Sequence, residues 1–342
     1  MPDPFAAAAV LREYALPPPS GVEALGNAGG FSGAALWRVS IGPALFCLRR
    51  WPAGTNSERV ATIDRILRRT NLSFLPIPLL SRRQQGVVSH DGILWTLSPW
   101  MPGEAIAHPS ALQLRNAMQA LAAFHAAVSD DPQFPRHLVG SPATLTSRLQ
   151  TLRDFDLAAI QNAPLPPGWE RLEPVRRAVH SFFSEFPPHL LLTRHEGAKG
   201  LQLPLQICLR DVWSAHVLFT GDEVTGLIDF DAMRVDSVAL DLARLLGSYA
   251  GDDSAIWSAG LEAYDFAAKN ATTGGLSLPE RELARRYDEL AVILTPVQWL
   301  SWILLQQRQF EPETVLPRIA GTIQRLEHLR HHLRTSPQWL AE

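Results

Sequence analysis

The sequence predicts an α+β protein of two lobes, a small β-rich N-terminal lobe over residues 1–102 and a larger, mostly helical C-terminal lobe over residues 103–342. Two observations support this division. Residues 22–102 contain short apolar runs separated by turns rich in glycine and proline, whereas most of the chain after Gly103 shows the apolar spacing of helices. The exception is a β-rich island at residues 205–231, which lies inside the helical part.

The first elements of the N-terminal lobe follow from local patterns. A leader helix is expected at residues 5–16, because three consecutive prolines follow it and proline cannot continue a helix. A glycine-rich loop at residues 26–33 precedes two strands, Ala35–Val39 and Ala44–Arg49, on either side of a Gly-Pro turn. Two β-rich runs around such a turn predict a hairpin.

The rest of this lobe contains one main helix and two further strands. The segment Thr55–Glu58 has the pattern of a capping box and predicts a helix over residues 56–70. Strands are expected at residues 85–89 and 93–97. The pattern then breaks at Ser98–Gly103, which predicts a hinge between the lobes.

The C-terminal lobe is predicted from apolar residues that recur at helical spacing. Residues 190–199 are expected to form a loop, and the β-rich island interrupts the helices. The expected helices are 111–128, 143–162, 170–185, 237–250, 254–270, 279–309 and 312–334.

The composition excludes several classes of protein. A net charge of −3 gives no reason to expect nucleic acid or an anionic membrane as a partner. We find no targeting peptide and no apolar run of the roughly 18 to 20 residues that a membrane span needs. Two cysteines cannot form a disulfide framework or fill a zinc site, so we expect a cytoplasmic protein. Only Lys199 and Lys269 are lysines, so chemistry that usually needs lysine must use arginine.

The β-rich island carries the most informative pattern, because it contains two carboxylates. Asp211 and Asp229 are 18 positions apart and are separated by two apolar runs with a turn between them. A strand–turn–strand of that length brings both side chains to one edge of a hairpin. Phosphoryl transfer uses this layout, since one carboxylate orients the attacking hydroxyl and another holds the magnesium that bridges the phosphates.

The island resembles the catalytic core of the aminoglycoside phosphotransferase and choline kinase family, small-molecule relatives of the protein kinases. The resemblance covers most of the chain and implies the two-lobed protein-kinase-like fold. Its motifs here are Leu97–Gly103, Leu121–His125, Asp211, the strand Val217–Phe219, the segment Gly226–Phe230, Asp236 and Asp241–Ala243.

The resemblance implies an ATP-dependent phosphotransferase that phosphorylates a hydroxyl of a small molecule. It implies that Asp211 is the catalytic residue, that Asp229 binds magnesium, and that Arg49 replaces the lysine which holds the phosphates. The acidic partner of Arg49 remains open between Glu58 and Asp64, and His125 is expected to be a hydrogen bonder in the core. The expected nucleotide-binding residues are Gly29, Gly30 and Ser32 of the loop, Arg49, and Trp100 and Met101 of the hinge, with Trp95 as a further apolar neighbour.

Three residues depart from the family pattern. The loop histidine of the family is Leu209 here, its glycine is Arg210, and its metal-binding asparagine is His216. Magnesium prefers oxygen ligands, so imidazole ligation would favour manganese or another transition metal; the alternative is that His216 only donates a hydrogen bond. A second reading is therefore a catalytically impaired kinase-like binding or scaffold protein. The acceptor, the choice between ATP and GTP, and the oligomeric state stay open.

Overall fold

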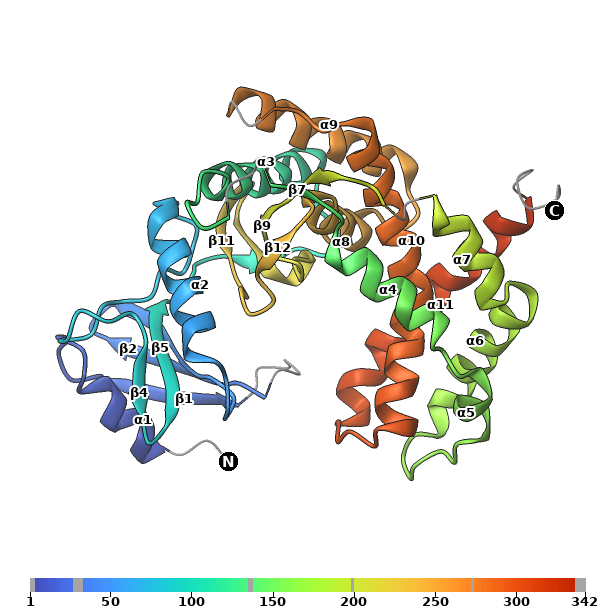
Figure 1. Ribbon diagram of the computed structural model, residues 1–342. Coiled ribbons are helices and arrows are strands. Elements are labelled where there is room, and N and C mark those ends of the chain that lie inside the picture. The colour runs from blue at the N-terminus through green and yellow to red at the C-terminus, as the bar shows by residue number, and fades with distance from the viewer. Residues whose placement is uncertain (1–3, 27–32, 135–137, 198–199, 272–273, 336–342) are drawn as a thin grey trace.

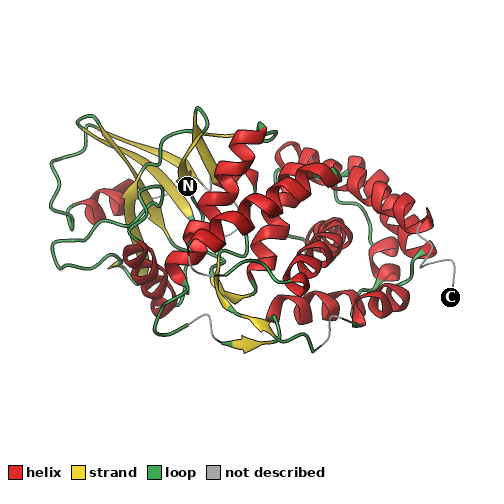
Figure 2. Cartoon of the chain, turned by 90° about the horizontal axis from the view of Figure 1, so that it is seen from above, coloured by secondary structure: helices red, strands yellow, loops and turns green. Residues whose placement is uncertain are grey.

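The computed structural model describes residues 4–26, 33–134, 138–197, 200–271 and 274–335. It has the two lobes that the sequence predicts: an antiparallel sheet with its helices forms one lobe, and helices form most of the other (Figures 1 and 2). The strands β9, β11 and β12 of the island lie between the N-terminal sheet and the outer helices of the large lobe (Figure 1). The predicted fold class is therefore confirmed.

The N-terminal lobe is built on a five-stranded antiparallel sheet with the strand order β1-β2-β3-β5-β4. The predicted hairpin is β2 and β3, which pair from Ala35 with Arg50 to Ile41 with Ala44. The helices and strands of this lobe are α1 (Pro4–Leu11), β1 (Gly21–Gly26), β2 (Ala35–Ile41), β3 (Ala44–Arg50), α2 (Ser57–Thr70), β4 (Val88–His90) and β5 (Ile93–Pro99).

The two faces of this sheet have different partners, because side chains alternate along each strand. One face packs against α1 in a small apolar core that contains Trp37, Leu48 and Leu97. The opposite face carries Cys47 and Arg49, opposite Ser98 and Thr96 in the register of β3 and β5. The predicted sharing of one face by Cys47 and Arg49 follows from this register.

Two local predictions in this lobe were wrong in detail. The leader helix ends at Leu11 rather than at residue 16, because Tyr14 is buried in the small core and pairs with Ser81 in an isolated β-bridge. Helix α2 is capped by Asn56, whose Oδ1 accepts a hydrogen bond from the backbone nitrogen of Arg59 at 3.1 Å. The expected capping box at Thr55–Glu58 was therefore wrong: the N-cap is one residue later, and Arg59 at the third position has no acceptor to complete a box.

The connection between the lobes passes through Gly103 and the short strand β6 (Glu104–Ala105), which pairs with β10 of the island. Gly103 has a φ of +99°, and a Cβ there would lie 2.6 Å from the carbonyl oxygen of Phe219. No other residue fits so close to that backbone, which explains the glycine of the hinge pattern.

The C-terminal lobe contains the remaining elements. The island forms the strands β9 (Gln206–Cys208), β10 (Val217–Thr220), β11 (Glu223–Leu227) and β12 (Arg234–Asp236), with the short helix η2 (Ser214–His216). A two-stranded ladder joins β7 (Val139–Gly140) to β8 (Leu203–Pro204). The helices are α3 (Ala111–Val128), α4 (Ala143–Arg153), α5 (Leu157–Asn162), η1 (Glu170–Leu172), α6 (Glu173–Glu185), α7 (Pro188–Glu196), α8 (Val238–Ala250), α9 (Ser254–Asn270), α10 (Leu278–Leu300), the π-helical η3 (Ser301–Leu305) and α11 (Pro312–Thr335).

Three predictions about these helices need correction. The helix expected at 143–162 is two helices, because Asp156 caps α5 and begins a new one. Most of the loop expected at 190–199 is helical, since α7 begins at Pro188 and proline fits the first turn of a helix. The helix expected at 279–309 ends in the π-helical turn η3 and stops at Leu305.

One helical segment, Leu278–Leu305, is long and apolar enough to cross a membrane by length and composition alone. The expectation that no apolar run reaches the length of a membrane span was therefore wrong for an 18-residue stretch of this segment. In the structure 56% of it is buried inside the protein, and α10 packs against α8, α11, α4 and α6. Its apolar character is thus explained by its place in the core of the large lobe.

Glu289 of α10 carries a pH-dependent contribution to stability. Burial opposes its ionisation, but His195 and Arg194 of α7 outweigh burial and lower the pKa of Glu289 to about 2. A depressed carboxyl pKa stabilises the fold fully above the unfolded value near 4.5, and the contribution is lost as pH falls towards 2. We expect Glu289→Gln to lower the free energy of unfolding by about 1–3 kcal/mol at pH 7.

Urea unfolding of wild type and variant at several pH values tests this expectation. The two free energies of unfolding should converge as pH falls below about 4.5. A difference that is the same at pH 7 and pH 3 would show that the ionised form of Glu289 contributes nothing.

Candidate active site

The hairpin of β10 and β11 brings Asp211 and Asp229 together through His216. The backbone nitrogen of Ile228 donates to the carbonyl of His216 at 3.0 Å, which places Asp229 beside the imidazole. Nδ1 of His216 donates to the backbone carbonyl of Asp211 at 2.7 Å, and Nε2 lies 3.7 Å from Oδ2 of Asp229. His216 thus lies between the backbone of Asp211 and the side chain of Asp229 at one end of the hairpin, while the carboxylate of Asp211 pairs with Arg244.

The bond to the Asp211 carbonyl fixes the tautomer of His216. A carbonyl only accepts, so Nδ1 carries the proton and the lone pair of the imidazole is on Nε2. That lone pair accepts a hydrogen bond from the indole nitrogen of Trp213 at 2.9 Å. The arrangement matches that of metal-binding histidines, in which the second nitrogen donates to a backbone carbonyl, but Trp213 holds the position that a metal would take.

Two residues of the site have a left-handed backbone. Arg210 and Asp229 both have a φ of +67°, a conformation that costs an ordinary residue roughly 1–2 kcal/mol. Glycine would adopt this conformation at position 210 without that cost. Contacts of the arginine offset the cost, since its Nη2 donates to Oγ1 of Thr144 at 3.0 Å.

The loop before Asp211 is held from below by the fully buried carboxylate of Asp241 on α8. Its oxygens accept from the backbone nitrogens of Leu209 and Arg210 at 2.7 and 2.6 Å. Nε2 of His125 donates to the same carboxylate at 3.0 Å, and Nδ1 accepts from the hydroxyl of Tyr264 at 2.7 Å. His125 is thus a hydrogen bonder in the core, as predicted.

Arg49 of β3 reaches the carboxylates that follow β11. Its Nη2 pairs with Oδ2 of Asp231, and its Nη1 lies 3.9 Å from Oδ1 of Asp229. Neither expected acidic partner contacts it, because Asp64 pairs with Arg68 at 2.9 Å and Glu58 is exposed at the start of α2. The acid that holds Arg49 thus comes from the island.

Asp231 is in an unusual electrostatic position. Burial raises its pKa to about 6, and the neighbouring Asp229 adds to this effect although Arg49 opposes it. Arg59 of α2 also donates to the backbone carbonyl of Asp231. Two arginines of the small lobe are therefore bound to the segment that carries Asp229.

The hinge residues differ in their exposure. Trp100 is 36% exposed, and Arg38 lies 5.8 Å above its ring. Met101 is buried against the hairpin, where a Cβ on Gly226 would lie 2.9 Å from its Cβ. Trp95 packs against Trp37 in the small core and does not line the cleft, so its expected role was wrong.

The predicted phosphate loop is only partly described. Gly29, Gly30 and Ser32 lie outside the described residues. The chain on either side ends β1 at Gly26 and begins β2 at Ala35, so the loop connects the first two strands of the sheet. The role of Gly29, Gly30 and Ser32 in nucleotide binding stays a prediction.

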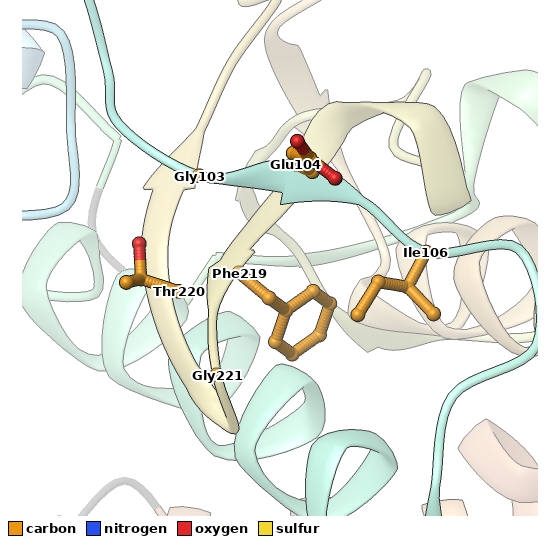
Figure 3. Close-up of a pocket in the computed structure, with 6 residues that line it drawn as sticks. All are labelled: Gly103, Glu104, Ile106, Phe219, Thr220 and Gly221. Carbon is orange, nitrogen blue, oxygen red and sulfur yellow. The ribbon is translucent and has the colours of Figure 1, made fainter.

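A shallow open pocket of about 490 Å³ lies beside the connection between the lobes. Its lining residues are Gly103, Glu104 and Ile106 of the connection and Phe219, Thr220 and Gly221 of β10 and its turn (Figure 3). The side chains of Phe219 and Ile106 face one another there (Figure 3). None of the predicted catalytic or metal-binding residues lines it.

Sequence reasoning missed three residues that the structure places at the site. Arg244 of α8 pairs with Oδ1 of Asp211, Asp231 pairs with Arg49, and the indole of Trp213 binds His216. The sequence contained a signal for Asp231, because it follows Asp229 by two positions. A residue so close to Asp229 in the chain must also lie near it in the fold. Arg244 had no such signal, since its contact depends on how α8 packs.

Comparisons with known proteins give one family and several relatives. Residues 23–277 match the family model described as the phosphotransferase enzyme family. A homoserine kinase of Rhodopseudomonas palustris (strain HaA2) is 29% identical over 141 residues, which is 41% of this chain and 36% of that relative. The matched region thus spans only about a third of the length of that curated relative.

Solved structures with the same fold include a spectinomycin phosphotransferase in complex with ADP and spectinomycin. It aligns with a TM-score of 0.63 at 14% identity and covers 94% of this chain and 93% of that chain. A microcompartment-associated aminopropanol kinase aligns with a TM-score of 0.57 at 14% identity, with 97% and 98% covered. An amicoumacin kinase aligns with a TM-score of 0.60 at 13% identity, with 97% of each chain covered.

Proposed function

Because the chain belongs to the phosphotransferase enzyme family, we propose that it is an ATP-dependent kinase which phosphorylates a hydroxyl of a small molecule. The observation that carries this proposal is the meeting of Asp211, Asp229 and Arg49 at one end of the β10–β11 hairpin. Phosphoryl transfer is catalysed mainly by positioning and by charge, and these groups supply both.

Each residue has a distinct role in this proposal. Oδ2 of Asp211 has no partner among the described residues, and the side chain is 47% exposed, so it accepts the hydrogen bond of the acceptor hydroxyl. The hydroxyl oxygen bonds to the γ-phosphorus of ATP while the bond to the β–γ bridging oxygen breaks. The proton passes to Asp211, and ADP leaves with the bridging oxygen. Arg49 binds the phosphates, since guanidinium pairs well with phosphate oxygens.

The donor set fits a divalent cation. Asp229 and Asp231 supply carboxylate oxygens two positions apart, and Nε2 of His216, 3.7 Å from Asp229, would join them once the indole of Trp213 moves away. Carboxylates suit magnesium, and the imidazole adds a preference for manganese. Bound there, the cation would neutralise charge on the phosphates. The nucleotide base is proposed to lie against Trp100 and Met101 at the hinge.

The names of the relatives indicate which acceptor classes to test first. The curated relative is named a homoserine kinase, and one structural relative is named an aminopropanol kinase. Hydroxy amino acids and amino alcohols therefore lead the acceptors to be tested, ahead of sugars.

Calorimetric titration with ATP and magnesium, followed by ADP release with a panel of alcohols, tests the proposed function. We expect saturable nucleotide binding and turnover with at least one acceptor. Purified protein that binds no nucleotide at millimolar concentrations would contradict the kinase function and favour the scaffold alternative.

The role of His216 can be tested through Trp213. If Nε2 of His216 binds the metal, Trp213→Phe removes the competing indole donor and should tighten manganese binding, while His216→Asn should shift the preference towards magnesium. Manganese electron paramagnetic resonance on the nucleotide-bound protein measures both affinities. Equal affinities in wild type and both variants would show that His216 is only a hydrogen bonder.

A further inference from the structure

Arginines gather on the side of Asp211 that faces α8 and α4. Arg244 of α8 pairs with Oδ1 of Asp211. Burial lowers the pKa of Arg148 of α4 to about 10, and repulsion from the positive charge of Arg244 acts in the same direction. Arg318 of α11 lies 6.0 Å above the ring of Trp213 in the same loop.

Asp236 and Asp288 oppose the charge of Arg148, but both carboxylates are already engaged by other groups, Asp288 by Arg325 at 2.7 Å. Asp236 is buried and already accepts from Thr144, Ser237 and Tyr287. It also lies 3.9 Å from Nε of Arg210. Asp211 is the one carboxylate that Arg244 contacts in the described part of the chain, and Asp211 must also serve the acceptor hydroxyl.

Arg244 retains hydrogen-bonding capacity towards a ligand. Its side chain is 30% exposed, and only Nη2 has a partner among the residues that the structure describes. Nε is buried from solvent, so a ligand would bind through the two Nη nitrogens. A guanidinium that holds one carboxylate through Nη2 can bind a second carboxylate through its remaining donors, because the donors form a planar fork.

We propose that the acceptor is a hydroxy acid whose carboxylate is bound by Arg244 while its hydroxyl is bound by Asp211. This inference rests on the proposed kinase function and specifies its substrate class. Arg148 strengthens the attraction, because a carboxylate beside Arg244 relieves the repulsion between the two guanidinium groups. Cationic acceptors without a carboxylate are disfavoured by the same charges. Arg244 is thus a residue that determines specificity.

The test compares an amino acid acceptor with a counterpart in which an uncharged ester replaces the carboxylate. Turnover is measured with L-homoserine and with L-homoserine methyl ester, which keeps the hydroxyl and the amine but lacks the carboxylate. In the wild type we expect kcat/KM for the acid to exceed that for the ester by about 10- to 100-fold, as expected for a charge-assisted hydrogen bond. Arg244→Gln should bring this ratio close to one.

The ratio separates specificity from a general loss of activity. Because Arg244 also contacts Asp211, the variant can lose kcat with every acceptor, but only loss of a carboxylate contact removes the difference between acid and ester. Arg171→Gln is the matched control, since it removes a positive charge from an exposed ion pair with Glu313 and should keep the wild-type ratio.

The outcomes distinguish the inference from the function on which it rests. A wild type that uses the ester or 3-aminopropanol as well as the acid would overturn the inference and leave the kinase function standing. A ratio that survives in Arg244→Gln would also overturn it. No turnover and no ATP binding with any acceptor would overturn the proposed function itself.

Discussion

Asp211→Asn is expected to lower kcat by about two to four orders of magnitude and to leave ATP binding unchanged. The amide keeps the size of the side chain and part of its contact with Arg244, but it cannot take the proton of the acceptor hydroxyl. Asp211 lies on the loop after β9 and makes no contact with Arg49 or Asp229 through its side chain in the described residues. Steady-state ADP release and calorimetry with a non-hydrolysable ATP analogue measure the two quantities.

Asp222→Asn provides the matched control for this experiment. Asp222 lies in the exposed turn between β10 and β11, and its contact with Asn116 of α3 uses its backbone carbonyl. The control should have wild-type kcat. Turnover in Asp211→Asn equal to that of the control would show that Asp211 has no catalytic role.

Asp241→Asn is expected to produce the largest loss of stability, about 2–4 kcal/mol in the free energy of unfolding. The carboxylate of Asp241 is fully buried and accepts from Leu209, Arg210 and His125. An asparagine has one accepting oxygen, so its amide group would face at least one of these donors. Urea unfolding followed by tryptophan fluorescence measures the loss.

The same substitution should also lower kcat, because it releases the loop that positions Asp211. Arg210 has a left-handed backbone, and the bond from its nitrogen to Asp241 helps to hold it there. The control is again Asp222→Asn, whose free energy of unfolding should equal that of the wild type. A variant that is destabilised but keeps full kcat would show that Asp241 supports the fold and does not position the catalytic loop.

Much of the fold could be predicted because it depends on patterns that are local in the chain. The apolar spacing of residues 111–128 predicted α3 with the bounds that the structure has. The turn at Gly42 and Pro43 predicted the β2–β3 hairpin. One error occurred where a distant contact ends an element, because burial of Tyr14 against the sheet ends the leader helix early. Others had local causes, such as the cap at Asp156 that begins α5.

Some features of the site could likewise be predicted from the sequence, and others could not. The spacing of Asp211 and Asp229 predicted that both flank one hairpin, because two apolar runs with a turn between them separate the two residues. The choice between Glu58 and Asp64 as partner of Arg49 could not be made, and neither is the partner. Asp231 is 182 positions from Arg49 in the sequence, and no local pattern relates residues so far apart.

The sequence by itself therefore determined the two lobes, the order of the strands in the hairpins and the pair of aspartates, since backbone periodicity and turn chemistry act over a few residues. Only the tertiary structure decided which side chains surround that pair. Arg244 contacts Asp211 because α8 packs beneath the catalytic loop, and Trp213 binds His216 because the short helix η2 turns the indole towards the imidazole. Such contacts depend on the packing angles of whole elements, which follow from the complete core.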